Sequence, residues 1–308
     1  MEADRLNSPS TSVITFEVLG HQLQFAQDPN SKHLGTTVWD TSMVFAKFLE
    51  KNCRKGRFCP SKLKGKRVIE LGAGCGVAGF GMALLGCEVV STDQIEVVPL
   101  LRRNVERNTS RIMQMNSNSD SFGSIKVAEL DWGNEDHIKA VAPPFDYVIG
   151  TDVVYAEHLV EPLLQTIIAL SGPKTTIMLG HEIRSTSVHE QMLQTWKNFF
   201  DVKIVPKAKM DSKYQHPSIQ LFIMGPKPPA VTAESAISTE KPENVARGID
   251  EVEVEPSNTV QDEEENHGNN SLVDDLPSTR LPDGKLSEWE ARRYGSMAAR
   301  LLREVKIT

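Results

Sequence analysis

At 308 residues the chain is long enough for one large domain or two small ones, and its formal net charge of −7 arises at its carboxyl-terminal end. Residues 1–225 carry 24 acidic and 24 basic residues, whereas the rest carry 17 and 10, so the larger part offers no broad basic face for phosphate contacts and nucleic acid is not expected as a partner. The four cysteines form no C-x-x-C pair and have no zinc-like spacing to histidine, which argues against a metal site and a secreted disulfide framework.

The first 34 residues predict an extension that contains a β-hairpin. Apolar and polar side chains alternate in two short runs, between Thr11 and Ala26, on either side of Gly20. Acidic residues interrupt the apolar stretches here, which is untypical of a signal peptide, and no apolar run in the chain approaches the roughly 18 residues of a membrane-spanning helix. We therefore expect a soluble protein of the cytoplasm, and also of the nucleus, without a membrane partner.

Apolar runs then recur along the chain with helix-like stretches between them. This alternation predicts an α/β fold with a doubly wound, Rossmann-like parallel sheet. A helix near 188–200 precedes two final strands near 201–205 and 218–224, the last of them antiparallel, which makes seven strands. The first five expected strands are Arg67–Leu71, Glu88–Thr92, Ile125–Glu129, Phe145–Ile149 and Thr175–Leu179.

The carboxyl-terminal part differs in composition. Residues 226–284 are rich in Pro, Glu, Asp, Ser and Asn with few large apolar side chains, so we expect an acidic disordered linker. Within residues 285–308, Ser287 and Glu290 form a capping-box pattern ahead of apolar residues at helical spacing. This predicts a terminal amphipathic helix, whose apolar face would dock on the chain itself or on a partner.

The strongest motif is a glycine-rich turn that follows the first strand of the sheet. Ligands of doubly wound sheets bind beyond the carboxyl ends of the strands, and glycines let the backbone turn tightly and approach a cofactor. The turn contains Gly72, Gly74, Gly76 and Gly79, and the last three also fit the G-x-G-x-x-G pattern of dinucleotide-binding enzymes. Alone, the motif does not choose between cofactors.

Asp93 ends the second strand, about twenty residues beyond the glycines, where a carboxylate can accept hydrogen bonds from ribose hydroxyls. Both NAD and S-adenosylmethionine would use such an acid. The alternative role for Asp93 is to cap the helix that follows.

The loop after the fourth strand separates the two cofactors. Asp152 and Tyr155 stand there, and a carboxylate suits a cationic sulfonium better than a pyrophosphate. The aromatic rings of Trp39, Trp132 and Tyr155 offer stacking or cation–π surface, although core packing is the ordinary role of such tryptophans. These residues favour S-adenosylmethionine.

The same loop bears on the methyl acceptor. It lacks the Pro-Pro-aromatic sequence typical of enzymes that methylate amide or base nitrogens. A lysine amine has a reference pKa of about 10.4, so freeing its lone pair at neutral pH costs on the order of 4 to 5 kcal/mol. An apolar channel beside a sulfonium would lower that pKa, and Asp152 or a water could take the proton.

Taken together, these motifs resemble the seven-β-strand protein-lysine methyltransferases, and within them the methyltransferase-like 21 group, which modifies chaperones and related ATPases. The resemblance spans Gly35 to Met224, within an expected domain of residues 35–225. Its marks are Thr37–Asp40, Glu70–Gly74, Thr92–Asp93, Leu130–Trp132 and Gly150–Tyr155.

The resemblance implies a monomeric enzyme that transfers a methyl group from S-adenosylmethionine to a lysine of a protein substrate, such as a chaperone or ATPase. It places Asp152 and Tyr155 at the acceptor. Cys75 and Thr151 stand where relatives often carry Thr and Ala, which leaves the substrate open. The residues that the resemblance assigns to the cofactor are Trp39, Gly72, Ala73, Gly74, Asp93, Trp132 and Thr151.

Two other functions remain open at this point. One is an NAD(P)-dependent oxidoreductase, because of the glycine pattern, and the other is a non-catalytic methyltransferase-fold scaffold that uses its tail as an adaptor. Histidines 137, 158, 181 and 189 have no ligand-like spacing and receive no role, although His181 and Glu182 follow the fifth strand on the acceptor side.

Overall fold

The computed structural model describes residues 12–28, 30–115 and 121–227. Nearly all of the predicted linker (226–284) and the whole predicted terminal helix (285–308) lie outside these ranges. All the residues predicted to form the site lie inside them.

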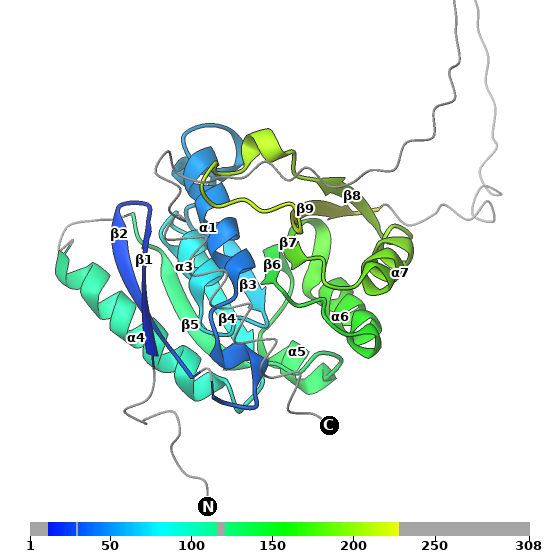
Figure 1. Ribbon diagram of the computed structural model, residues 1–308, viewed down its shortest axis with the longest axis horizontal. Coiled ribbons are helices and arrows are strands. Elements are labelled where there is room, and N and C mark those ends of the chain that lie inside the picture. The colour runs from blue at the N-terminus through cyan, green and yellow to red at the C-terminus, as the bar shows by residue number, and fades with distance from the viewer. Residues whose placement is uncertain (1–11, 29, 116–120, 228–308) are drawn as a thin grey trace, which may run out of the picture. The chain divides into compact units, whose positions relative to one another are not determined.

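A mixed sheet of seven strands forms the centre of the described fold (Figure 1). Its order is β5-β4-β3-β6-β7-β9-β8, and β9 runs antiparallel to both of its neighbours while the other neighbouring pairs are parallel. The doubly wound sheet with an antiparallel last strand is thus confirmed. The strands are β3 (Arg67–Leu71), β4 (Glu88–Asp93), β5 (Ser124–Glu129), β6 (Phe145–Thr151), β7 (Ser171–Glu182), β8 (Phe200–Ile204) and β9 (Ile219–Pro226).

Helices cover both faces of the sheet, as a doubly wound fold requires. Neighbouring residues of β7 show the two faces: a Cβ at Gly180 would collide with Thr41 of one helix, whereas the His181 ring stacks on His189 of another. One face carries α1 (Asp40–Asn52), α3 (Val77–Ala83) and α4 (Val98–Met115), and the other carries α5 (Glu135–Ala140), α6 (Glu157–Leu170) and α7 (Thr186–Trp196). Short helices α2 (Pro60–Leu63), η2 (Leu34–Thr36), η3 (Gly56–Phe58) and η4 (Lys207–Lys209) lie in the connections.

The predicted hairpin consists of β1 (Ser12–Val18) and β2 (His21–Gln27), which pair with each other in a separate two-stranded sheet. Its two-residue turn has positive φ at Leu19 (52°) and Gly20 (76°), the geometry whose twist matches that of the strands. Strand β2 lies beside α4 (Figure 1), where Asn104 Oδ1 accepts a hydrogen bond from the Ala26 amide and Asn108 Oδ1 accepts one from the Gln24 amide. The side-chain amides of the same two asparagines donate back to the carbonyls of Ala26 and Gln24.

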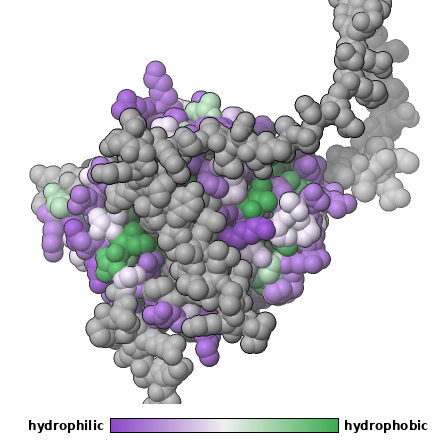
Figure 2. Space-filling model, in the orientation of Figure 1, coloured by the Kyte–Doolittle hydropathy of each residue, from purple (hydrophilic) through white to green (hydrophobic). Residues whose placement is uncertain are grey.

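Hydrophilic side chains make up most of the coloured surface in Figure 2, with apolar side chains in separate patches. Within the described residues, no helix combines the length and apolar character needed to cross a lipid bilayer. Two of the larger exposed apolar side chains belong to loops at the carboxyl ends of the strands, Ile95 after β4 and Tyr155 after β6.

Candidate functional site

The glycine turn joins β3 to α3 at the carboxyl edge of the sheet. Gly72, Gly74 and Gly76 have φ values of 58°, 56° and 92°, a left-handed region that a side chain disfavours. The Ala73 amide donates to the Thr92 carbonyl over 2.9 Å, and the Gly74 amide donates to Asp93 Oδ2 over 2.7 Å. The turn is thereby fixed directly to the end of β4, a contact that the sequence did not show.

Glu70 supports the turn from below. This buried side chain accepts hydrogen bonds from the Gly79 amide over 3.0 Å and from the Ser91 hydroxyl over 2.5 Å. A Cβ at Gly79 would collide with Glu70 Oε2, so the last glycine of the motif is needed for contact between α3 and this carboxyl group. Burial raises the pKa of Glu70 to about 7, with its hydrogen bonds to Ser91 and Gly79 opposing the rise.

Asp93 lies at the junction of the turn and β4, with 8% of its surface exposed. Its carboxylate accepts from the amides of Gly74 and Gln94, which leaves lone pairs for other donors because a carboxylate has about four acceptor positions. Burial raises its pKa to about 6, against the opposing effect of these two hydrogen bonds. The next helix, α4, begins only at Val98, so capping it is not the role of Asp93.

The segment after the hairpin covers the glycine turn. A Cβ at Gly74 would approach the Gly35 carbonyl oxygen to 2.9 Å, and a Cβ at Gly35 would approach Asp93 Oδ2 to 3.3 Å. Two backbone segments therefore meet here with no room for side chains on either. Gly35 was not among the predicted site residues.

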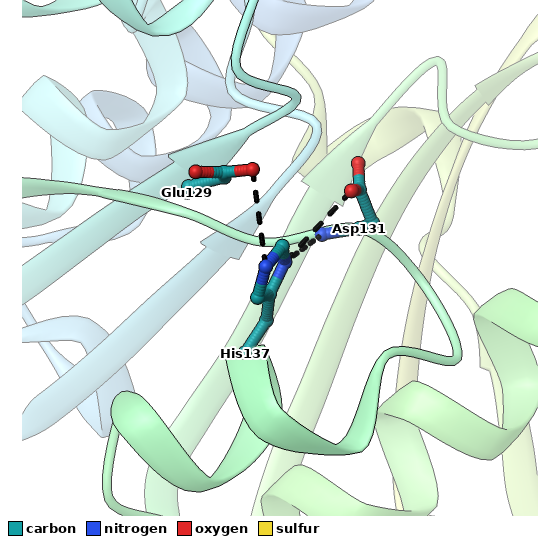
Figure 3. Close-up of side chains that lie close together, drawn as sticks. All are labelled: Glu129, Asp131 and His137. Atoms are coloured by element: carbon teal, nitrogen blue, oxygen red, sulfur yellow. Dashed lines mark hydrogen bonds and ion pairs between the residues drawn. The ribbon is translucent and has the colours of Figure 1, made fainter.

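Trp132 lies in the loop after β5 and reaches the glycine turn, where its Cζ2 atom would be 3.3 Å from a Cβ at Gly72. Figure 3 shows how this loop is held: the His137 ring from α5 lies between Glu129 and Asp131. His137 Nδ1 accepts the Asp131 amide over 3.1 Å, and its Nε2 lies 3.8 Å from Glu129 Oε1. These three side chains are of types that bind metals, and the hydrogen bond between the Asp131 amide and the His137 ring ties α5 to the loop that carries Trp132.

Asp152 faces a cation on the acceptor side. This non-glycine residue has a φ of 57°, and its side chain is almost entirely buried. Oδ1 accepts from the Glu182 amide over 3.0 Å and from Arg184 Nη1 over 3.4 Å, and Oδ2 lies 3.4 Å from Arg184 Nη2. The sequence predicted that Asp152 could face positive charge, but it did not identify this arginine.

Trp39 lies on the same side, and the Arg184 guanidinium carbon lies 4.8 Å from the centre of its ring. Trp39 is oriented by a hydrogen bond of 2.9 Å from its Nε1 to the Leu34 carbonyl. Arg184 also donates to Glu182 Oε2 over 2.6 Å. The sequence places Glu182 on the acceptor side, after an apolar run that ends at Leu179, but it assigns no role to Glu182 and does not identify Arg184; in the structure β7 continues to Glu182.

Thr151 and Tyr155 complete the predicted set. Thr151 ends β6 and is half-buried, with its methyl group beside Gly180 of β7. Tyr155 is 46% exposed, and its pKa is raised by partial burial of the phenol and by the Asp93 carboxylate. The structure thus gathers the predicted residues along one sheet edge, at the switch between β3 and β6.

This arrangement fits a nucleoside joined to a cationic sulfonium. The left-handed glycines form a cradle free of side chains, and Asp93 has acceptor positions for ribose hydroxyls beside it. The buried carboxylate of Asp152 stands across the switch point, where it favours positive charge and disfavours a pyrophosphate. The geometry therefore supports S-adenosylmethionine over NAD.

Comparison with known proteins agrees with the site. A sequence model described as lysine methyltransferase matches residues 18–200. The protein N-lysine methyltransferase METTL21A of Danio rerio is 35% identical over 169 residues, which cover 55% of this chain and 70% of the relative. METTL21A of Xenopus tropicalis is 30% identical, covering 62% and 80%. The EEF1A lysine methyltransferase 3 of Xenopus tropicalis is 33% identical, covering 48% and 57%.

Proposed function

The chain belongs to the lysine methyltransferase family and transfers a methyl group from S-adenosylmethionine to a lysine of a protein substrate, and from this premise we propose how its residues divide the work and which proteins it modifies. The observation that carries the proposal is the junction of the glycine turn with Asp93 on one side of the β3–β6 switch point and the buried Asp152 on the other.

In the cofactor half of the site, the turn from Gly72 to Gly74 would take the methionine part of S-adenosylmethionine against its backbone. Asp93 would accept hydrogen bonds from the ribose hydroxyls with the lone pairs that Gly74 and Gln94 leave. Trp132, held beside Gly72, and Thr151 would complete the walls. The sequence also predicts that Trp39 lines the cofactor. Its contact with Arg184 supports a position between the cofactor half and the acceptor half of the site.

In the acceptor half, Asp152 and Tyr155 would orient the lysine amine. When bound, S-adenosylmethionine supplies an electrophilic methyl group on its sulfonium. Asp152 would hold the amine by a hydrogen bond and receive or relay its proton, and a partly desolvated surrounding would favour the neutral amine. Transfer then depends on alignment of the amine, which requires no covalent intermediate with the protein.

For the substrate we propose a chaperone or a related ATPase. The support is kinship with the METTL21 group, since METTL21A relatives match at 35% and 30% identity. A protein whose own name states EEF1A as its target also matches, over 57% of its length. The exposed side chains of Leu34, Ile95 and Tyr155, on three loops at this edge of the sheet, give a protein substrate apolar surface to contact.

Labelling of a cell extract tests the proposal. The full chain is incubated with radiolabelled S-adenosylmethionine and extract, and mass spectrometry then identifies the modified residue in the labelled band. We expect a methylated lysine in a chaperone or ATPase; methylation of another class of protein would overturn the substrate class. A D152A variant should lose transfer yet still bind S-adenosylhomocysteine by calorimetry, whereas D93A should lose both.

Two further measurements test the two other functions. Stabilisation by NADH and not by S-adenosylhomocysteine in a thermal melt would indicate an oxidoreductase. A partner interaction that survives D93A, in a protein that transfers no methyl group, would indicate a scaffold.

A further inference from the structure

A positively charged group already occupies the acceptor side of the site. The Arg184 guanidinium lies over the Trp39 ring at 4.8 Å and contacts both Asp152 and Glu182. The two carboxylates are buried, with 2% and 8% of their side-chain surface exposed, whereas 34% of the Arg184 side chain is exposed. The acids are therefore fixed parts of the fold, the ring is held by its hydrogen bond to the Leu34 carbonyl, and the arginine reaches them from the solvent side.

An aromatic face with two carboxylates is a binding site for a substituted ammonium as much as for a guanidinium. Cation–π attraction acts on both groups within about 6 Å of the ring centre. With Arg184 counted, the cluster of Trp39, Asp152 and Glu182 carries one net negative charge; without it, the cluster carries two. A lysine amine that arrived as ammonium would restore the same balance that Arg184 gives the free enzyme.

The side-chain lengths of the two residues also correspond. The Nζ atom of lysine and the Cζ atom of arginine stand at the same number of bonds from the backbone. A lysine nitrogen at position 184 could therefore reach the place above the Trp39 ring where Cζ now lies.

We propose that Trp39, Asp152 and Glu182 form the subsite for the acceptor lysine, and that Arg184 holds the place of the substrate ammonium until the substrate displaces it. This rests on the proposed role of Asp152 at the acceptor. It adds Glu182 and the face of Trp39 as residues that recognise the lysine, and it makes Arg184 an internal competitor.

The R184K variant tests the subsite without any protein substrate. In the full-length R184K chain, incubated alone with S-adenosylmethionine, the new amine should itself be methylated: the bond from sulfur to the methyl carbon breaks, the carbon–nitrogen bond forms, and the proton leaves to Asp152, Glu182 or water. Mass spectrometry of the peptide spanning position 184 should show the added methyl mass. Absence of that mass from an R184K chain that still binds S-adenosylhomocysteine would overturn the subsite.

Two matched controls accompany R184K. R107K places an amine on the exposed side of α4 and should gain no methyl group. R184K combined with D93A should also stay unmodified, because the cofactor is no longer held; modification in that double variant would mean non-enzymatic alkylation. Labelling of the extract by the wild-type chain is measured separately. If the wild-type chain labels a protein but R184K gains no methyl group, the proposed subsite fails while the proposed function stands.

The R184Q variant tests the competition. Towards the protein labelled in extract, R184Q should show a several-fold lower KM, because no internal cation has to be displaced and the site is more negative. A raised KM, or a fall in kcat at constant KM, would instead show that Arg184 only supports Asp152. Unchanged affinity for S-adenosylhomocysteine would confirm that the cofactor half is intact.

Discussion

At the scale of single residues, the site depends on carboxyl groups whose surroundings differ. Glu70 is enclosed beneath the turn, and its hydrogen bonds to the Gly79 amide and the Ser91 hydroxyl make it a structural group. Asp93 stands at the surface of the cofactor cradle with lone pairs to spare, and Asp152 is held by an arginine and an amide. The sequence assigned roles to Asp93 and Asp152 but none to Glu70, whose supporting role is shown only by its contacts.

Asp93 should make cofactor binding sensitive to acid. Because burial raises its pKa to about 6, the carboxylate is protonated below that pH and loses an acceptor for the ribose hydroxyls. We expect the affinity for S-adenosylhomocysteine, measured by calorimetry from pH 8 to pH 5, to fall below about pH 6. The D93N variant should bind weakly at every pH with little slope, and a slope equal to that of the wild type would contradict the assignment.

Gly79 should not tolerate a methyl group. In G79A the new Cβ would collide with Glu70 Oε2 and lie 2.5 Å from Ser91 Oγ, both of which are buried and hydrogen-bonded. We expect the free energy of unfolding to fall by about 2 to 4 kcal/mol in urea titrations. G225A is the matched control, since nothing lies within 4 Å of a Cβ there, and it should be close to neutral.

At the scale of elements, the hairpin supports the site although it pairs with no strand of the main sheet. Asn104 and Asn108 of α4 satisfy the backbone of β2, and the chain then passes through Gly35 onto the glycine turn. Weakening the contact between α4 and β2 should therefore lower the affinity for the cofactor.

The N104A variant tests that connection. It removes the buried hydrogen bonds of Asn104 to the amide and carbonyl of Ala26 and to the Cys75 carbonyl, at a cost of about 2 to 3 kcal/mol in stability. Affinity for S-adenosylhomocysteine should weaken as well. E106A, on the exposed side of the same helix, should change neither; weakened binding in E106A would mean that α4 itself, rather than its contact with β2, controls the cofactor.

The sequence predicted the strands well because a sheet covered by helices on both faces needs continuous apolar runs. It predicted the functional loops at the carboxyl ends because glycines and acidic residues directly follow those runs. It could not show that β7 extends to Glu182, since polar residues in a strand carry no apolar signal. Nor could it show the contact of Gly35 with Gly74 or of Trp39 with Arg184, because these pairs lie far apart in the chain and meet only through tertiary packing.

At the scale of the whole molecule, His181 should set part of the acid stability. This histidine is 2% exposed on β7, and burial, with smaller effects from His189 and Arg184, lowers its pKa to about 4. An unfolded histidine has a pKa near 6.5, so between these values the unfolded chain binds the extra proton and stability falls as pH falls. The loss should be on the order of 2 to 3 kcal/mol between pH 6.5 and pH 4.

Comparison of H181L with the wild type checks this effect. The raised pKa values of Glu70 and Asp93 act in the opposite direction, so the difference between the two proteins across the pH series is the informative quantity. H181L should lose less stability than the wild type below pH 6.5. Parallel curves would show that the fold does not lower the pKa of His181.

The fold and cofactor binding of the catalytic unit should not depend on the acidic tail. All proposed site residues lie in a compact unit that ends at Pro228, whereas the excess negative charge lies beyond it. A chain cut after Pro228 should keep its melting temperature within a few degrees and its affinity for S-adenosylhomocysteine. A large loss of either would mean that residues 229–308 take part in the fold or the site.

The positive φ of Asp152 restricts which enzymes could evolve from this one. Among residues with side chains, asparagine and aspartate enter that conformation most readily, whereas β-branched and bulky residues are strained there. Descendants that methylate a different acceptor group would therefore have few substitutions available at position 152 itself. Diversification of the target would instead proceed through Trp39, Glu182 and Arg184, whose backbones are free of that restriction.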